Sequence, residues 1–280
     1  MAALGIIGLT IIIASGVITY YGLQSYSYLN RYSFRVDDIL ARKDYKRLIT
    51  SGFLHVSWRH YIFNMLTLYF FSSGLEDFIG AGKFLAIYFG SLLGGNLLAL
   101  FIHRNHYNYS AVGASGAVSG IVFAAIALFP GISIGFFFLP VHIPGWVYGL
   151  LYVLYSIYGI KSQKDNIGHE AHLGGGAIGL LIALAFFPEA ITSNTLPILA
   201  ILIPSILFVW LIAKKPNIIT TGTSFGQKKK YYDIDEKYWA QKAEREKELN
   251  YLLDKISTKG MESLSDKEKE RLKDLSEKTW

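Results

Sequence analysis

A serine and a histidine set among small residues are the groups in this chain best suited to chemistry. Ser115 lies in the tetrapeptide GASG at the start of one apolar run, and His172 lies in AHLGG in a later run. Polar groups at membrane depth are costly without partners, so such residues usually have a functional reason. A histidine that accepts the proton of a serine hydroxyl creates a nucleophile, which predicts hydrolase chemistry. The alternative is two buried polar side chains bonded to neighbouring helices.

The glycines around the serine allow the backbone to come close to it. Gly113 and Gly116 flank Ser115, and a helix that begins near Gly113 directs free N–H groups toward the serine. Such donors can stabilise an oxyanion as it develops. The same spacing of small residues also favours close contact between membrane helices. The pattern therefore predicts either an oxyanion site or a helix contact.

A second polar pair lies in an earlier apolar run. His60 and Asn64 are four residues apart, which places them on one face of a helix. An imidazole and an amide that point the same way could donate hydrogen bonds to an oxyanion, together with the N–H of Ser115. A purely structural pair is the alternative interpretation.

A metal site is disfavoured by the spacing of the possible ligands. His169, Glu170 and His172 form HExH, whereas the zinc-binding helix motif is HExxH. The sequence contains no cysteine, which excludes thiolate ligands, disulfides and a cysteine nucleophile. We therefore predict no metal and no cofactor.

Apolar stretches long enough to cross a bilayer carry these groups. The chain of 280 residues is 52% hydrophobic, its mean hydropathy is +0.32, and its apolar residues come in blocks, which is typical of membrane proteins. A bilayer core of about 30 Å takes about 20 helical residues to cross. Seven runs of about that length predict seven spanning helices, at 3–23, 60–80, 84–102, 113–129, 143–160, 171–187 and 196–213. The net charge of +6 gives no reason to expect a nucleic-acid partner.

Three further segments lie outside these runs. The stretch 24–59 mixes basic and aromatic residues, which is typical of a segment in the lipid headgroup region. His55 and Arg47 could fasten it by hydrogen bonds, and the alternative is that either side chain faces the headgroups. Residues 214–234 resemble a linker, and 235–280 predict a small charged helical hairpin. Ser265 followed by Glu268 predicts a capping box at the start of the second hairpin helix.

Together, these motifs resemble those of the rhomboid family of intramembrane serine proteases. The matching elements are His60 and Asn64 in the second run, GASG at the start of the fourth and AHLGG in the sixth, in the family's order. The resemblance covers about residues 1–190. It implies an all-α polytopic membrane fold with a six-helix bundle, to which 191–213 would add a seventh membrane helix.

The resemblance also implies roles for the residues. Ser115 would be the nucleophile and His172 its base, without an acidic third member. His60, Asn64 and the N–H of Ser115 would hold the oxyanion. Arg47 would anchor the first interfacial loop, and Gly113 and Gly116 would support the site. The substrates would be transmembrane segments of other membrane proteins.

One departure from the family pattern concerns the support of the base. The position four after the nucleophile, which in the family often carries an aromatic ring stacked on the histidine, is Ser119 here. Either another ring, such as Tyr148 or Tyr152, would then hold His172, or this histidine would be held less firmly.

Two other classes of membrane protein fit the same sequence. The alternatives are a catalytically inactive rhomboid-like protein that binds membrane helices, and a transporter or channel.

We expect a multi-pass protein of the plasma membrane of a bacterium. The loops after odd-numbered runs hold ten Lys and Arg residues against Lys83 alone after even-numbered runs, which favours the opposite orientation to the one that the family implies. We favour the family's orientation. The oligomeric state is left open.

Overall fold

Two compact units make up the chain, residues 1–225 and residues 226–280. The computed structural model describes residues 5–136, 139–162, 165, 167–214, 248–258 and 260–277. The predicted linker 214–234 lies almost entirely outside the described residues.

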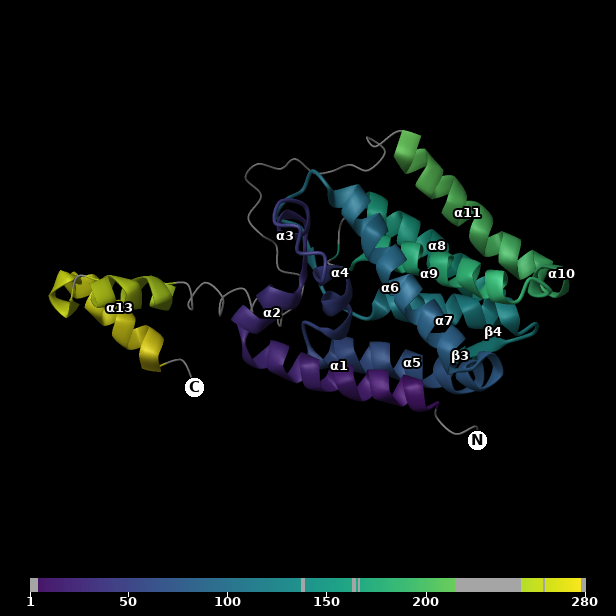
Figure 1. Cartoon of the computed structure of the whole chain (residues 1–280), viewed down its shortest axis with the longest axis horizontal. Coiled ribbons are helices and arrows are strands. Elements are labelled where there is room, and N and C mark those ends of the chain that lie inside the picture. Colours follow the sequence, from purple (N-terminus) through teal and green to yellow (C-terminus); the bar gives the residue numbers. More distant parts are fainter. Residues whose placement is uncertain are drawn as a thin grey trace. The chain divides into compact units, whose positions relative to one another are not determined.

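Long helices dominate the first unit (Figure 1). They are α1 (Ile6–Gln24), α5 (Trp58–Ile79), α6 (Ala81–His103), α7 (Ser115–Leu128), α8 (Gly145–Ser162), α9 (His169–Phe186) and α11 (Thr195–Lys214). They match the seven predicted runs, and four of them, α1, α6, α9 and α11, are both long and apolar enough to cross a membrane. The prediction of an all-α polytopic membrane fold with an appended seventh helix is confirmed.

The central helix α7 is shorter than its neighbours. It has 14 residues, and every one from Gly116 to Leu128 is buried. At a rise of 1.5 Å per residue it is about 21 Å long, less than the roughly 30 Å of a bilayer core. Because other helices surround α7, its apolar residues are covered by protein rather than by lipid.

Small residues bring α6, α7 and α9 into direct backbone contact. A Cβ added at Gly174 would lie 3.1 Å from the Cα of Gly95, and one added at Gly116 would lie 3.0 Å from the carbonyl oxygen of Ala171. A Cβ at Gly175 would overlap the Gly116 carbonyl. Such close approach requires glycine and is typical of membrane helices. Gly116 therefore makes the close helix contact that its spacing predicts, and this contact does not exclude an oxyanion site at the neighbouring Ser115.

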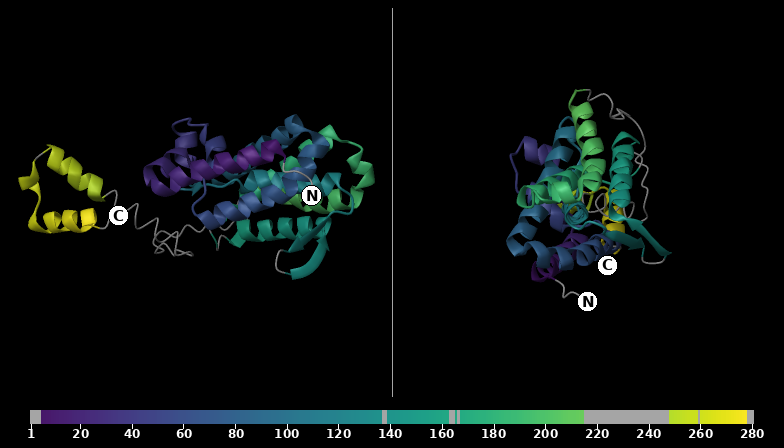
Figure 2. Two further views of the ribbon diagram at one scale, coloured as in Figure 1. Left: turned by 90° about the horizontal axis from the view of Figure 1, so that it is seen from below. Right: turned by 90° about the vertical axis from the view of Figure 1, so that its right-hand side faces the viewer.

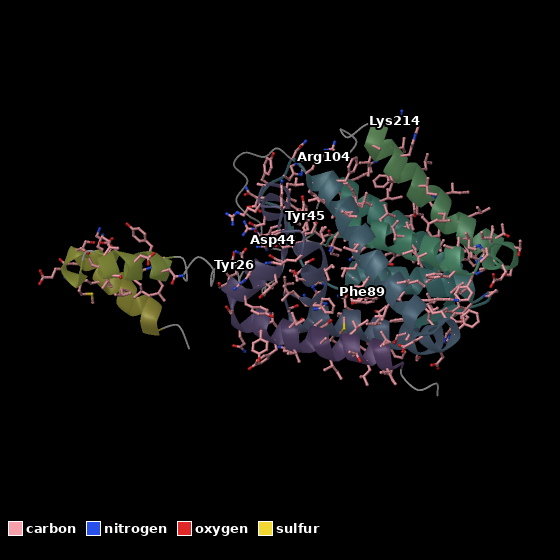
Figure 3. The ribbon with its side chains drawn as sticks, in the orientation of Figure 1. Tyr26, Asp44, Tyr45, Phe89, Arg104 and Lys214 are labelled. Carbon is pink, nitrogen blue, oxygen red and sulfur yellow. The ribbon has the colours of Figure 1, made fainter. Side chains whose placement is uncertain are left out.

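Short elements fill the predicted interfacial segment 24–59. They are α2 (Tyr26–Tyr32), β1 (Phe34–Arg35), α3 (Val36–Leu40), α4 (Arg47–Thr50) and the 3-10 turn η1 (Ser51–Phe53). Strand β1 pairs antiparallel with β2 (Ser110–Ala111), so that Phe34 lies opposite Ala111. Tyr26, Asp44 and Tyr45 lie toward the end of the unit where Arg104 follows α6 (Figure 3).

The connection between the predicted runs 113–129 and 143–160 contains two strands that the sequence analysis does not predict. Strands β3 (Ser133–Phe136) and β4 (Leu139–Pro144) form an antiparallel hairpin that projects beside the helices (Figure 2). Extended pairing satisfies backbone groups that an irregular connection would leave open. Helix α8 consequently begins at Gly145, two residues later than predicted.

Polar side chains fasten the ends of the helices. Both carboxylate oxygens of Glu76, on α5, accept hydrogen bonds from backbone N–H groups at the start of α1, from Ile7 and Gly8 at 3.0 Å each. Asn194 follows α10 (Ala190–Ser193), and its Nδ2 donates to the carbonyl oxygen of Ile126 at 2.6 Å near the end of α7. These bonds satisfy groups that helix ends leave unpaired.

The second unit contains a small helical hairpin. Residues 248–258 are helical and are followed by the 3-10 turn η3 (Met261–Ser263) and by α13 (Asp266–Glu277). The predicted capping box is confirmed, because Ser265 N–H donates to Glu268 Oε2 at 2.8 Å and Glu268 N–H donates to Ser265 Oγ at 3.4 Å. Leu252 and Leu264 are the buried core of this hairpin.

Candidate active site

One cavity collects the four polar residues that the sequence singles out. Ser115, His172, His60 and Asn64 all line a cavity of about 300 Å³. Three helices that are distant in sequence contribute them, namely α5, α7 and α9. The rest of the lining is mostly apolar and aromatic and includes Phe63, Val118, Val122, Phe123, Tyr148 and Tyr152. A concave, largely apolar site with a few convergent polar groups is typical of an active site.

Ser115 is the first residue of α7, so the local turn sets its position. Gly113 has φ +138°, a conformation that favours glycine, and its N–H donates to the carbonyl oxygen of Ser51 at 3.0 Å. A Cβ at Gly113 would lie 3.0 Å from His60 Nε2 and 3.6 Å from Ser115 Oγ. The glycine therefore leaves open the space between the serine and the His60 ring.

His55 fixes the residue just before the serine, and the sequence reasoning gave it no part in the site. Its Nε2 accepts from the N–H of Ala114 at 3.4 Å, so in the neutral ring Nδ1 carries the proton. Nδ1 then donates to Thr19 Oγ1 at 2.9 Å, and Thr19 donates to the carbonyl oxygen of Phe53 at 3.2 Å. The buried His55 thereby connects α1 to the turn before α7.

The ring of Tyr152, on α8, supports His172. The two rings stack with centroids 5.9 Å apart at an interplanar angle of 24°. The phenol oxygen of Tyr152 lies 2.7 Å from Ser119 Oγ, which itself donates to the carbonyl oxygen of Ser115 at 2.7 Å. Because Ser119 uses its proton on Ser115, Tyr152 is the donor of the bond to Ser119. Of the two predicted rings, Tyr152 contacts the histidine, and Tyr148 stacks behind it at 5.9 Å.

The predicted oxyanion donors lie on the face of α5 that borders the cavity. Ser57 caps this helix by accepting the N–H of His60 at 3.2 Å. Asn64 Nδ2 donates to the carbonyl oxygen of His60 at 3.0 Å, which leaves the second amide hydrogen for another acceptor. The His60 ring packs edge-on against His55 at 4.9 Å.

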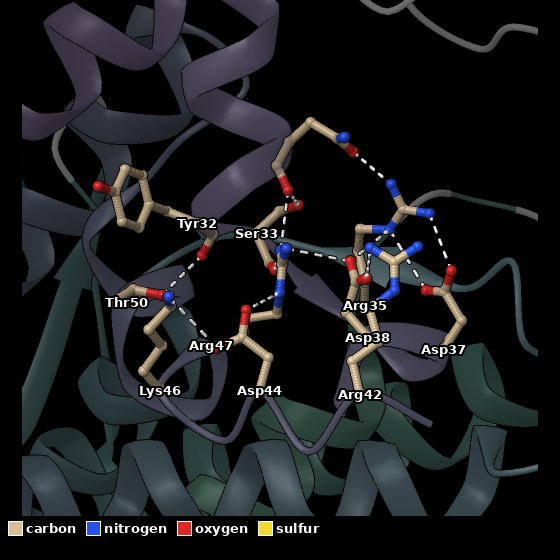
Figure 4. A network of polar contacts seen from close by, with 11 residues as sticks. Tyr32, Ser33, Arg35, Asp37, Asp38, Arg42, Asp44, Lys46, Arg47 and Thr50 are labelled. Atoms are coloured by element: carbon tan, nitrogen blue, oxygen red, sulfur yellow. Dashed lines mark hydrogen bonds and ion pairs between the residues drawn. The ribbon is translucent and has the colours of Figure 1, made fainter. Parts of the chain in front are cut away.

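Arg47 is outside the cavity and holds the interfacial segment together (Figure 4). Its guanidinium is paired with Asp38 and Asp44 at 3.0 Å each, and it donates to the carbonyl oxygens of Asn30 and Ser33 at 2.8 Å each. The side chain is only 8% exposed. Arg47 is therefore a buried structural anchor whose Nε, Nη1 and Nη2 each contact acceptors of the protein.

The three polar residues of the HExH motif point in different directions. His169 Nε2 contacts Asp165 at 3.1 Å, Glu170 contacts His103 at 2.9 Å, and His172 faces the cavity. Within the part of the chain that the structure describes, no group of three potential ligands could hold a metal ion.

Comparison with known proteins identifies two segments. Residues 42–189 match the model of the Rhomboid domain, and residues 232–278 match a family of unknown function, DUF6576. The first match contains Arg47, His60, Asn64, Ser115 and His172.

Individual relatives come from both mitochondria and bacteria. Rhomboid protein 1, mitochondrial, from Saccharomyces cerevisiae is 33% identical over 150 residues, 51% of this chain and 43% of the relative. RHOMBOID-like protein 12, mitochondrial, from Arabidopsis thaliana is 28% identical over 192 residues, 63% and 56% of the two chains. Putative rhomboid protease YdcA from Bacillus subtilis is 30% identical over 146 residues, 51% and 68%. The chain spans about half the length of the two mitochondrial relatives. Since the Rhomboid domain covers more than half of it, the chain belongs to the rhomboid family.

Proposed function

We propose that this multi-pass membrane protein is an intramembrane serine endopeptidase that cleaves transmembrane segments of other proteins. The observation that carries the proposal is the cavity in which Ser115, His172, His60 and Asn64 meet. A relative whose name includes "rhomboid protease" supports the same activity.

In the proposed reaction, each of these groups has one role. Ser115 Oγ attacks the carbonyl carbon of the scissile peptide while the imidazole of His172 accepts its proton. The carbonyl oxygen becomes an oxyanion, which accepts hydrogen bonds from the Ser115 N–H, the His60 ring and the free amide hydrogen of Asn64. The C–N bond then breaks, His172 protonates the leaving amine, and an acyl-enzyme remains on Ser115.

The second half of the reaction needs water in the cavity. His172 deprotonates a water molecule, which attacks the acyl carbon through a second oxyanion. Collapse of that intermediate releases the carboxylic acid and returns the proton to Ser115 Oγ. The short α7 supports this step, since a helix too short to cross the bilayer can place the serine where other helices form a wetted opening.

Substitution of the nucleophile tests the proposal. The full-length protein and the Ser115→Ala variant are reconstituted in liposomes with a model transmembrane substrate. We expect cleavage and covalent labelling by a fluorophosphonate with the unsubstituted protein and neither with Ser115→Ala. Ser133→Ala is the matched control, because Ser133 is exposed on β3 and outside the cavity. Undiminished cleavage by Ser115→Ala would overturn the proposal, and absence of labelling in the unsubstituted protein would favour the inactive helix-binding alternative.

We also propose that the membrane is the plasma membrane of a bacterium, for which the similarity to a Bacillus subtilis protein is the support. Fractionation of the source cells tests this location. Recovery of the protein with an organelle membrane would overturn it.

A further inference from the structure

A histidine at the end of α6 has every polar atom of its ring engaged, and the proposed reaction does not use it. His103 is the last residue of α6 and is 5% exposed. Its Nε2 lies 2.9 Å from Glu170 Oε1, and its Nδ1 lies 3.2 Å from Nδ1 of His106. A carboxylate only accepts, so Nε2 donates to Glu170, and one proton lies between the two Nδ1 atoms.

The carboxylate partner belongs to the helix that carries the base. Glu170 is in the first turn of α9, two residues before His172, and it is also buried. The N-cap of α9 is Gly168, which has no side chain to cap the helix. The bond to His103 is therefore the polar contact that attaches the start of α9 to α6. The dipole of α9 favours this pair, because the carboxylate of Glu170 lies at the start of that helix.

The same ring contacts the segment that leads to the nucleophile. Tyr109 stacks on His103 with centroids 3.7 Å apart and an interplanar angle of 8°. The carbonyl oxygen of Tyr109 accepts the N–H of Val36 at 3.2 Å, and the next two residues form β2. Ser115 follows six residues after Tyr109. Burial, and then the negative charge of Glu170, raise the pKa of Tyr109, so the phenol stays neutral.

His103 thus contacts both chain segments that the reaction must align. One segment continues into Ser115, and the other continues into His172. We propose that His103, held by Glu170 and His106, is a positioning residue that sets the base helix relative to the nucleophile turn. The proposal rests on the proposed function.

Stability alone is a weak reason for this arrangement. A buried pair of charged or polar side chains is often no more stabilising than apolar residues of similar volume. What hydrogen bonds add is direction, and displacements of about 1 Å far from the reacting atoms can lower a rate by about a hundredfold. A positioning role therefore predicts that removing the bond lowers the reaction rate without a matching decrease in the free energy of unfolding.

Variants of the pair separate position from stability. Glu170→Gln keeps a hydrogen-bond acceptor of the same length, and Glu170→Ala removes it. The double variant His103→Leu/Glu170→Leu fills the space with apolar side chains and has no directed bond. Glu189→Ala is the matched control, since Glu189 is an exposed carboxylate beyond the other end of α9.

Fluorophosphonate labelling of the full-length protein gives two separate quantities. The endpoint measures the fraction of molecules with an intact site, and the rate constant measures the reactivity of each site. We expect full endpoints in Glu170→Gln, in the double leucine variant and in the control. Glu170→Ala leaves His103 buried without its partner, so its endpoint should be lower and its rate constant is taken per labelled site. The rate constant should fall about tenfold in Glu170→Ala and in the double leucine variant, by less than about threefold in Glu170→Gln, and not at all in the control. With a transmembrane substrate, kcat should fall while KM stays unchanged.

Contrary results are distinguishable from one another. Unchanged rate constants in Glu170→Ala and the double leucine variant would overturn the positioning role alone. So would a loss confined to the endpoint, because that loss reports unfolded molecules. Equal losses in Glu170→Gln and Glu170→Ala would also count against it, because the bond geometry would then not matter. Absence of labelling in the unsubstituted protein would instead overturn the proposed function, and the positioning role with it.

Discussion

Tyr152, on α8, stacks on His172, and removing this ring should slow the reaction of Ser115. Tyr152 makes two contacts that can be removed one at a time, the stack on His172 and the 2.7 Å bond to Ser119. Tyr152→Phe keeps the ring and removes the bond. Tyr152→Leu removes both.

The expected magnitudes follow from these contacts. A buried hydrogen bond contributes about 1 kcal/mol, and an aromatic pair contributes about 0.5 to 1.5 kcal/mol beyond its buried area. We take this energy as what holds the His172 ring in position for proton transfer. Each 1.4 kcal/mol that is lost then lowers the rate constant of the reaction at Ser115 about tenfold. We expect Tyr152→Phe to lower the labelling rate constant of Ser115 by about threefold to fivefold, and Tyr152→Leu by about tenfold to a hundredfold.

A double-mutant cycle tests whether the bond to Ser119 is the cause. Ser119→Ala removes the same bond as Tyr152→Phe from the other side, so the double variant should be no slower than the slower single variant. Stopped-flow labelling with a fluorophosphonate, normalised to the endpoint, measures each rate constant. The reasoning would be refuted if Tyr152→Leu labelled at the unsubstituted rate, or if the two single effects simply multiplied in the double variant.

Three further predictions address packing, the interfacial anchor and the hairpin. Gly175→Ala, whose Cβ would overlap the Gly116 carbonyl, should destabilise the protein by about 1 to 3 kcal/mol and lower the labelling endpoint; an unchanged melting temperature in detergent would contradict it. Arg47→Ala removes one of the three arginine partners of the buried Asp38 and leaves the carbonyl oxygens of Asn30 and Ser33 without their guanidinium donor. Because a buried group left unsatisfied costs about 1 to 3 kcal/mol, the variant should lose about 2 to 5 kcal/mol in thermal unfolding, whereas a change below about 1 kcal/mol would show that the anchor is dispensable. Bonds from Lys255 first, and then from Ser265, lower the pKa of Glu268 to about 2, below its usual 4.5. The contribution of Glu268 to hairpin stability should therefore be fully present above about pH 4.5 and be lost as the pH falls toward 2. Hydrogen exchange of residues 248–277 measures this loss, and equal protection at pH 5 and pH 2.5 would contradict it.

Local patterns in the sequence were enough for the helices and for the candidate site residues. Apolar runs of spanning length predict the helices, because each helix satisfies its own backbone groups within one segment. The spacing of His60 and Asn64 predicts that they share a face, because that depends only on the helical repeat. The order of the three motifs along the chain was sufficient to indicate the family.

Contacts between distant segments could be seen only in the tertiary structure. The choice of Tyr152 over Tyr148 depends on how α8 lies against α9, and both tyrosines are on the same helix one turn apart. The β3–β4 hairpin depends on pairing between two short strands with little periodicity of their own.

The sequence by itself determined which segments are helices and which polar residues lie within them. Only the tertiary structure decided which of those residues meet, including the pair of His103 and Glu170, which are 67 positions apart. The physical reason is that helix formation depends on neighbours within about four residues, whereas the meeting of two side chains depends on how whole helices pack. Glycine contacts between α7 and α9 set that packing here, and they are what bring Ser115 and His172 to one cavity.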